Sequence, residues 1–408
     1  MILLCEVIFW VCIGAVAYNY FGYPVILFTL AVFAQAKADL LYLLRRRSRR
    51  CQSPREVPKV AVLISVYNEE DVIRAKVKNL QELDYPAERL EVWFGLDAPT
   101  DNTAEFLNEL PSSQFYSVQF SERRGKLAVL SDLSRRTSAE IFVITDANTM
   151  LDRNCIRNLA RHFADGRVGV VSGEEVRVAA GSVDAAGESL YWRYECALKM
   201  LENRLNCVQG ANGAALAVRR SLFPPKKQTI VEDFQISLEA RAQGYRVVYD
   251  PEAIAVEEVA PTSSAQFSRR VRIGCGDYQT LFHNLHCLNP LRGLPAFAFF
   301  SHRALRWLTP LLLLVAFACS IVMITQPGFI ELVAAQCIFY AMAITGYQLK
   351  KRGPSPRLLA IPLQFCATNL ALLFGFFRFL RGGQPLTWKS TFRRLQPEVV
   401  LDETASHR

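Results

Sequence analysis

The feature that most constrains the fold of this 408-residue chain is a set of long apolar segments near its two ends. Residues 1–34 contain a single charge, Glu6, and the basic run 45–50 follows them. Three further segments are almost free of charge: 307–326, 328–348 and 358–377. A helix needs about 20 apolar residues to cross a bilayer, so each segment is long enough for one span. Buried helices of a soluble core are the alternative, and four such lengths in one chain argue against it.

The positions of the basic residues also indicate a membrane protein. The formal net charge is +9, and basic clusters stand beside the apolar segments, at 45–50, 303–306, 350–352, 378–381 and 393–394. This is the positive-inside pattern, with anionic membrane lipid rather than nucleic acid as the partner. It predicts that residues 45–300 face the cytoplasm from the cell's inner membrane. A cleaved signal peptide fits residues 1–34 poorly, because the apolar stretch is long and the basic residues follow it.

These patterns divide the chain into five parts. They are an N-terminal transmembrane helix (1–44), a cytoplasmic domain (45–261), interfacial helices (262–306), C-terminal transmembrane helices (307–380) and a basic tail (381–408). One span before the domain and three after it place the tail outside, whereas the basic residues of the tail favour the inside. Either one apolar segment is re-entrant or interfacial, or the first folds back near residues 22–24. The side of the tail stays open.

The middle of the chain has the pattern of an α/β domain with a mainly parallel sheet, because strand-like apolar runs alternate with helix-like ones. The predicted strands are 59–66, 90–96, 115–120, 141–145, 168–172, 214–218 and 245–249. The predicted helices are 69–83, 101–110, 126–136, 153–163, 188–205 and 232–243. About 200 to 250 residues is an ordinary size for one such domain.

Acidic residues stand where predicted strands end. Asp97 follows the strand 90–96, Asp146 follows the strand 141–145, and Glu232 and Asp233 open a predicted helix. In an open α/β sheet, ligands bind beyond the carboxyl ends of the strands. Acidic residues at three separate places around one sheet could bind a metal-bound nucleotide and remove a proton from a substrate.

Polar residues at the same strand ends could bind the other parts of a nucleotide. Tyr67, Asn68 and Glu69 follow the first strand and could hold a base by stacking and hydrogen bonding, or simply cap the next helix. Asp97 could accept a hydrogen bond from a base N–H. Lys126, after a glycine at a helix start, could offset phosphate charge, although a surface basic patch is the more usual explanation.

Asp146 and Asn148 are the candidate metal ligands. Mg²⁺ or Mn²⁺ is commonly held by one or two carboxylates together with substrate phosphates, so a sparse protein shell is expected. Asn148 offers only a neutral carbonyl oxygen. Glu232 and Asp233 read alone as acids at a helix start, and within a nucleotide site as candidates for a general base.

Taken in order along residues 58–285, these motifs resemble the membrane-embedded, inverting family-two glycosyltransferases with a GT-A fold, the group of cellulose, chitin, hyaluronan and poly-N-acetylglucosamine synthases. The resemblance implies nucleotide contacts by Tyr67, Glu69 and Asp97, the last to uracil. It implies diphosphate contact by Lys126, metal binding by Asp146 with Asn148, and an acceptor-side segment that includes Gly213 and Ala214. It also implies Glu232 and Asp233 as catalytic residues, with Asp233 as the base.

Two departures from the family pattern limit what the resemblance implies. The DxD metal motif ends in Asn148, which leaves one firm carboxylate. The QxxRW motif of processive members aligns best with residues 269–273, where Arg269 replaces Gln and Ile273 replaces Trp. Because Ile cannot stack on a sugar as an indole does, long-chain polymerisation is in doubt. In the same comparison Arg269 is an acceptor contact. Arg272 could clamp the diphosphate, or both could contact lipid headgroups instead.

We therefore predict a membrane-bound inverting glycosyltransferase that moves a sugar from a UDP-sugar donor to a lipid-linked or saccharide acceptor, with Mg²⁺ or Mn²⁺ as cofactor. Two alternatives stay open. One is a processive synthase that also translocates its polymer. The other is a catalytically weak nucleotide-binding membrane subunit of an assembly complex, against which the intact Asp233 and Lys126 count.

Overall fold

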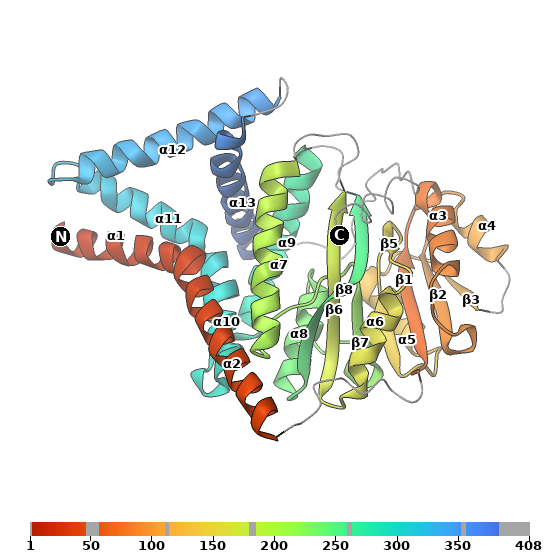
Figure 1. The fold of residues 1–408 in the computed structure, drawn as a ribbon. Helices are drawn as coiled ribbons and strands as arrows, with labels where there is room; N and C mark the ends of the chain where they lie inside the picture. The colour runs from red at the N-terminus through yellow and green to blue at the C-terminus, as the bar shows by residue number, and fades with distance from the viewer. Residues whose placement is uncertain are drawn as a thin grey trace. The chain divides into compact units, whose positions relative to one another are not determined.

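The computed structural model describes residues 2–45, 57–110, 114–178, 185–258, 263–351 and 356–382. The chain forms two compact units (Figure 1). The first, here called the helical unit, comprises the described residues within 1–43, 181–205 and 266–384. The second, the sheet unit, comprises the described residues within 44–180 and 206–265. The basic tail predicted for 381–408 lies outside the described residues beyond Gly382.

The sheet unit is built on one sheet of eight strands. They are β1 (Val60–Val66), β2 (Leu90–Asp97), β3 (Phe115–Phe120), β4 (Ile141–Ile144), β5 (Thr149–Leu151), β6 (Val168–Val178), β7 (Leu216–Arg219) and β8 (Arg246–Glu258). The spatial order is β3-β2-β1-β4-β7-β6-β8-β5. The first four in this order are mutually parallel, β7 is antiparallel to both neighbours, and β5 is antiparallel to β8. The predicted mainly parallel sheet with flanking helices is confirmed.

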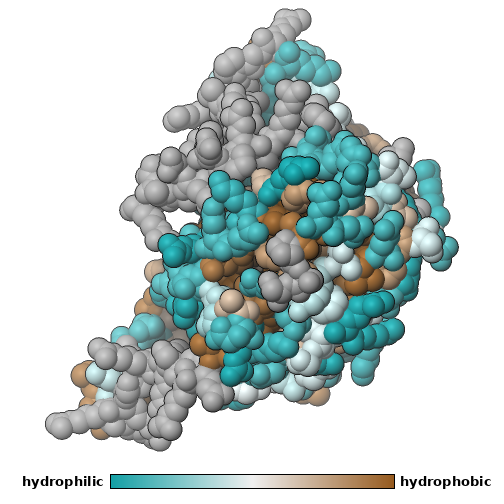
Figure 2. Space-filling view, turned by 90° about the vertical axis from the view of Figure 1, so that its right-hand side faces the viewer, coloured by the Kyte–Doolittle hydropathy of each residue, from teal (hydrophilic) through white to brown (hydrophobic). Residues whose placement is uncertain are grey.

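Both faces of this sheet are covered, which explains the continuous apolar runs in its central strands. In β1, Val62 and Ile64 pack in one buried cluster with Leu80 of α3 (Glu70–Gln81). The alternate residue Leu63 packs in a second cluster with Leu133 of α5 (Lys126–Ser134). The remaining helices of the unit are α4 (Thr103–Asn108), α6 (Cys155–Arg161) and α8 (Glu232–Ala242). On the face turned to the viewer in Figure 2, hydrophilic residues surround an area of apolar residues near the centre.

The structure differs from the sequence-based elements in β5, β6, β8 and α7. The three-residue strand β5 was not predicted, and β6 and β8 run well beyond the predicted strands 168–172 and 245–249. The predicted helix 188–205 is α7 (Ala185–Arg204), which belongs to the helical unit. The chain therefore leaves the sheet unit for α7 and returns to it within the segment predicted as one domain.

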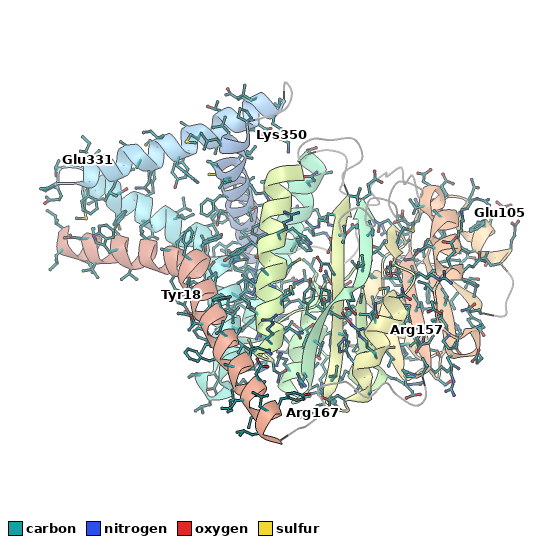
Figure 3. The ribbon with its side chains drawn as sticks, in the orientation of Figure 1. Tyr18, Glu105, Arg157, Arg167, Glu331 and Lys350 are labelled. Atoms are coloured by element: carbon teal, nitrogen blue, oxygen red, sulfur yellow. The ribbon has the colours of Figure 1, made fainter. Side chains whose placement is uncertain are left out.

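The helical unit contains four helical stretches that are long and apolar enough to cross a membrane: Ile2–Leu44, Leu294–Val322, Phe329–Lys350 and Leu358–Leu380. They contain α1 (Ile2–Ala17), η1 (Tyr18–Gly22), α2 (Tyr23–Arg45), α10 (Leu294–Ala298), η7 (Phe299–Ala304), α11 (Leu305–Val322), α12 (Phe329–Lys350) and α13 (Arg357–Leu380). Apolar helices at both ends of the chain are thus confirmed. Glu331 and Lys350 lie near the two ends of α12 (Figure 3).

Two of these stretches differ from expectation. The first is one 43-residue helical stretch that passes through residues 22–24 as the π-helical turn η1 and the start of α2, so it does not fold back there. The second begins at Leu294, and it includes His302 and Arg306, which lie before the predicted start at 307.

The side chains of His302 and Arg306 are buried against α7. His302 Nδ1 lies 2.6 Å from Glu202 Oε1, and its Nε2 lies 3.1 Å from Glu195 Oε2. Arg306 forms an ion pair with Glu195, and Tyr23 donates a hydrogen bond to Glu202 over 2.8 Å. Each of the five is at most 5% exposed. Charged groups can be buried in this way because each has a partner of opposite charge or a hydrogen bond.

Candidate functional site

The candidate site lies at the carboxyl ends of β1, β2 and β4, which share one edge of the sheet because the three strands are parallel. The backbone turns sharply there. Asn68 after β1 and Ala98 after β2 have φ angles of 50° and 52°, values that non-glycine residues seldom adopt. Gly125, before α5, has a φ of 85°. Such conformations cost energy and cluster at ligand sites, where surrounding contacts hold them.

The loops that follow β1 and β2 are tied together by hydrogen bonds. Asn68 Oδ1 accepts from the backbone N–H of Thr100 over 2.8 Å. The backbone N–H of Glu69 donates to Thr103 Oγ1 over 3.0 Å, and the Glu69 carbonyl accepts from the first turn of α3. Tyr67 and Glu69, predicted to bind the nucleotide, are therefore held on a cross-linked rim of the sheet.

Asp97 is fully buried and shapes the turn before α5. Its two carboxylate oxygens accept from the backbone N–H groups of Arg124 over 2.7 Å and Gly125 over 3.1 Å. The guanidinium of Arg123 lies 3.6 Å from the centre of the Tyr67 ring. Asp97 thus places Lys126 at the start of α5. Its contact with uracil stays a prediction.

Four charged side chains predicted from separate parts of the sequence meet at this edge. Lys126 Nζ lies 2.8 Å from Asp146 Oδ1 and 2.8 Å from Glu232 Oε1. A Cβ atom added to Gly213 would lie 3.4 Å from Asp233 Oδ2 and 3.7 Å from Lys126 Nζ. The loop before β7 therefore passes directly against the acid pair, and glycine leaves space beside Asp233.

The close packing of these charges changes their protonation. Burial and the neighbouring Glu232 raise the pKa of Asp233 to about 6, although Lys126 opposes the increase. Burial alone would lower the pKa of Lys126, but Asp146 and Glu232 raise it above its usual value. Lys126 is therefore a permanent cation, whereas Asp233 can gain or lose a proton near neutral pH.

Hydrogen bonds, one of them from Lys76 of α3, hold the turn that carries Asp146 and Asn148. Thr149 N–H donates to the Asp146 carbonyl over 3.2 Å, and Lys76 donates to the Thr149 carbonyl. Burial lowers the pKa of Lys76 to about 7, against the opposing charge of Asp146. The sequence analysis missed Lys76, although it interrupts an otherwise apolar stripe on α3, which is a usable signal.

The donor atoms present fit a cation shared with a substrate better than a cation held by protein alone. The Asp146 side chain is 37% exposed, and Asn148 is two residues further along the same turn. Among the described residues, no three His, Cys, Asp or Glu side chains are grouped to hold a metal. One carboxylate and one amide oxygen leave most positions around Mg²⁺ or Mn²⁺ for phosphate and water, as is usual for these ions.

The remaining predicted site residues fall in two places. Ala214 is buried, and its carbonyl accepts from Thr145 Oγ1 over 2.8 Å, so it anchors the glycine segment to β4. Arg269 and Arg272 lie on α9 (Ser263–His283), within the helical unit. Their contacts with acceptor and diphosphate stay predictions.

Part of the sequence that forms this site matches a known protein family. Residues 61–223, which include β1 to β4, Lys126 and Gly213, match Glycosyl transferase family 2. The chain contains a glycosyltransferase family 2 domain. Asp233 lies ten residues beyond the matched segment, and it joins the site through α8.

Relatives of this glycosyltransferase domain make different products. Poly-beta-1,6-N-acetyl-D-glucosamine synthase of Staphylococcus aureus (strain MSSA476) is 24% identical over 249 residues, which cover 59% of this chain and 60% of the relative. Beta-monoglucosyldiacylglycerol synthase of Synechocystis sp. is 26% identical over 273 residues, which cover 62% of this chain and 55% of the relative. The matches thus span less than two thirds of the relatives' lengths.

A solved structure has a similar fold along most of the chain. It is a mannosyltransferase from Pyrobaculum calidifontis in complex with GDP-Man and Mn²⁺, with a TM-score of 0.70 and 21% identity. The match covers 92% of this chain and all of that one. At this identity, the likeness shows the fold alone.

Proposed function

We propose that the protein is a membrane-bound inverting glycosyltransferase that moves a sugar from a UDP-sugar to a lipid-linked or saccharide acceptor at the cytoplasmic face of the inner membrane. The observation that carries this proposal is the ammonium group of Lys126, placed between Asp146 and Glu232 beside Asp233. It combines a cation for a diphosphate, a carboxylate for a metal and a second carboxylate able to take a proton.

Asp233 serves as the general base in this proposal. It accepts the proton of the acceptor hydroxyl as that oxygen bonds to the anomeric carbon and the bond to the diphosphate breaks, which inverts the configuration. With a pKa of about 6, Asp233 is mostly ionised at pH 7.5 yet basic enough to accept a proton. Gly213 leaves room beside it for the acceptor.

In this proposal Lys126 neutralises negative charge, first of the carboxylates and then of the donor diphosphate. Without donor it neutralises Asp146 and Glu232, and with donor bound it is placed to stabilise the charge that develops on the leaving diphosphate. Asp146 and Asn148 would hold a divalent cation, Mg²⁺ or Mn²⁺, which would share that charge when bound. Arg272 is a further proposed contact for the diphosphate.

The helical unit and the relatives support the proposed location and acceptor. Four helical stretches are long and apolar enough to span a membrane. The relatives are named as a polysaccharide synthase and a glycolipid synthase. Ile273 stands where processive members of the family have a sugar-stacking Trp, so single transfer is favoured over polymerisation.

The test uses the full chain purified in detergent with each of a set of radiolabelled UDP-sugars, with GDP-mannose for comparison, and lipid extracts or saccharides as acceptors. We expect transfer from one UDP-sugar with inverted configuration, and products one sugar longer than the acceptor. Asp233→Asn should bind donor normally while transfer falls by about 10²-fold or more. The control Asp84→Asn changes an exposed acid that pairs with Arg157 and should transfer normally.

Three outcomes would count against parts of this proposal. Normal transfer by Asp233→Asn would remove Asp233 as the base. A ladder of products would favour the processive synthase. Neither transfer nor donor hydrolysis with any nucleotide sugar would favour the nucleotide-binding subunit.

A further inference from the structure

The amide of Asn148 can face a cation in two ways with opposite effects. Its carbonyl oxygen Oδ1 can bind a metal, whereas its NH₂ group carries only donors and would repel one. A residue that fixes the orientation of this amide therefore determines whether Asn148 can be a ligand at all.

Glu257 is placed to fix that orientation. Asn148 Nδ2 lies 3.4 Å from Glu257 Oε1, a long hydrogen bond donated by the amide. Glu257 lies on β8 and is 4% exposed. Thr149, the residue after Asn148, pairs with Glu257 in the β5–β8 register, so the backbone holds the two side chains near each other.

The hydrogen bond itself gives the contact its direction. An amide nitrogen only donates, so Nδ2 of Asn148 is the atom held at Oε1 of Glu257. The amide oxygen is thereby turned away from Glu257.

We infer that Glu257 is a positioning residue that orients Asn148 so that Oδ1, and not the NH₂ group, is offered to the divalent cation. Asn148 and Glu257 then form a matched pair, which gives a physical reason for the missing second Asp of the metal motif. An Asp at position 148 would place a second carboxyl group against the buried Glu257 and would lose the amide N–H that donates to Oε1. The inference rests on the proposed function, because it presumes that a cation binds here.

Metal affinity of the purified full chain tests this pairing without relying on turnover. Binding of Mn²⁺ in the presence of UDP is measured by electron paramagnetic resonance. Glu257→Ala should weaken binding by about tenfold, as is typical when a partner of a metal ligand is removed. Glu252→Ala, on the same strand but 65% exposed and paired with Arg161, is the matched control and should bind as the wild type does.

Variants in which Asn148 alone, or both Asn148 and Glu257, are changed test the pairing more directly. Asn148→Asp should bind Mn²⁺ no more tightly than the wild type, although it adds a carboxylate. The double variant Asn148→Asp with Glu257→Gln should bind about tenfold more tightly than Asn148→Asp alone, because the glutamine amide can donate to the new carboxylate. This rescue also separates orientation from a general loss of folding, which circular dichroism monitors in each variant.

The outcomes for the two proposals are distinct. Wild-type-like Mn²⁺ affinity in Glu257→Ala, or tighter binding by Asn148→Asp with Glu257 intact, would overturn the inference while transfer by the wild type continues. A wild type that binds no Mn²⁺ with UDP and transfers no sugar would overturn the proposed function, and the inference with it.

Discussion

The charge balance of the site gives Lys126 and Asp233 different tasks. Three carboxylates, on Asp146, Glu232 and Asp233, face one ammonium group, so two negative charges are left when all are ionised. Asp146 and Glu232 each have Lys126 as an ion partner, whereas Asp233 is the acid whose ionised form is disfavoured. Asp233, whose negative charge Lys126 neutralises least, is thus the residue best able to take a proton.

The protonation of Asp233 predicts the acid side of the pH profile. A base must be unprotonated, so kcat/KM should fall about tenfold per pH unit below pH 6, where Asp233 gains its proton. Lys126 lowers this pKa, so Lys126→Met should move the acid limb of its residual activity to higher pH. Initial rates between pH 4.5 and 8.5 measure both effects. Constant activity down to pH 4.5 would contradict the assignment.

The same pKa predicts a gain of stability when the base is removed. A carboxyl with a pKa of about 6 in the folded chain and about 3.9 when unfolded stabilises the fold below the lower value, and this stabilisation is lost as the pH rises through 6. Asp233→Asn removes that loss, so its Tm should exceed the wild-type value by a few degrees at pH 7.5, with a smaller difference at pH 5. Thermal unfolding at both pH values measures this. A lower Tm for the variant at pH 7.5 would refute it.

At the scale of elements, α3 acts as the support of the metal-binding turn. Asn79 Nδ2 donates to the Leu151 carbonyl over 2.8 Å, and its Oδ1 accepts from the Leu151 N–H over 2.8 Å. Asn79 therefore takes the place of a neighbouring strand along β5, and Lys76 does the same for the Thr149 carbonyl. The short strand keeps its position because a helix satisfies backbone groups that β8 cannot reach.

Removal of the Asn79 side chain should lower the stability of the fold. Asn79→Ala leaves a buried donor and a buried acceptor of Leu151 without their partner, which costs roughly 2–4 kcal/mol of unfolding free energy. Because β5 follows Asn148 directly, Mn²⁺ affinity should fall as well. Urea unfolding and Mn²⁺ titration measure the two effects. Lys78→Ala, an exposed change on the same helix, is the control, and equal behaviour of both variants would exclude the support role.

The strands that the sequence predicts well are those whose burial is either uniform, as in β1 and β4, or alternating, as in β3. The predicted strand 115–120 coincides with β3, and β1 and β4 were placed within a residue because every side chain in them is buried. β5 is too short for any periodicity. The outer halves of β6 and β8 carry charged residues such as Arg177 and Glu257, which resemble a loop in sequence while they pair in the sheet.

In the candidate site, too, the sequence predicts some residues and misses others. Its acids and Lys126 were predicted because each follows a recognisable strand or opens a helix, and those positions converge once the strands are parallel. Lys76 and Glu257, which contact Thr149 and Asn148 in the turn after Asp146, were missed because these contacts join segments more than 70 residues apart. For the same reason the second apolar stretch was placed too late, since the buried pairing of His302 and Arg306 with α7 is invisible in sequence.

At the scale of the whole molecule, that buried pairing joins three distant parts of the chain. Asn19 and Tyr23 come from the first apolar stretch, Glu195 and Glu202 from α7, and Arg306 from the second apolar stretch. α7 lies between two segments of the sheet unit in sequence, and these contacts tie it to two apolar stretches of its own, helical unit. A polar cluster of this kind specifies one arrangement of apolar helices, whose other contacts are non-directional.

Loss of either charge from this cluster should therefore cost more than loss of both. Glu195→Gln leaves the buried Arg306 without its ion partner, and Arg306→Met leaves Glu195 with Arg303, 3.7 Å away, as a more distant cation. Breaking a buried ion pair costs about 3–5 kcal/mol. The double variant removes both charges and should recover most of the stability. Thermal aggregation in detergent, followed by size-exclusion chromatography, measures the three variants. Glu331→Gln, at the exposed end of α12 (Figure 3), is the control and should match the wild type. If the double variant is as unstable as the sum of the singles, the charges act independently and the pairing does not hold the helices together.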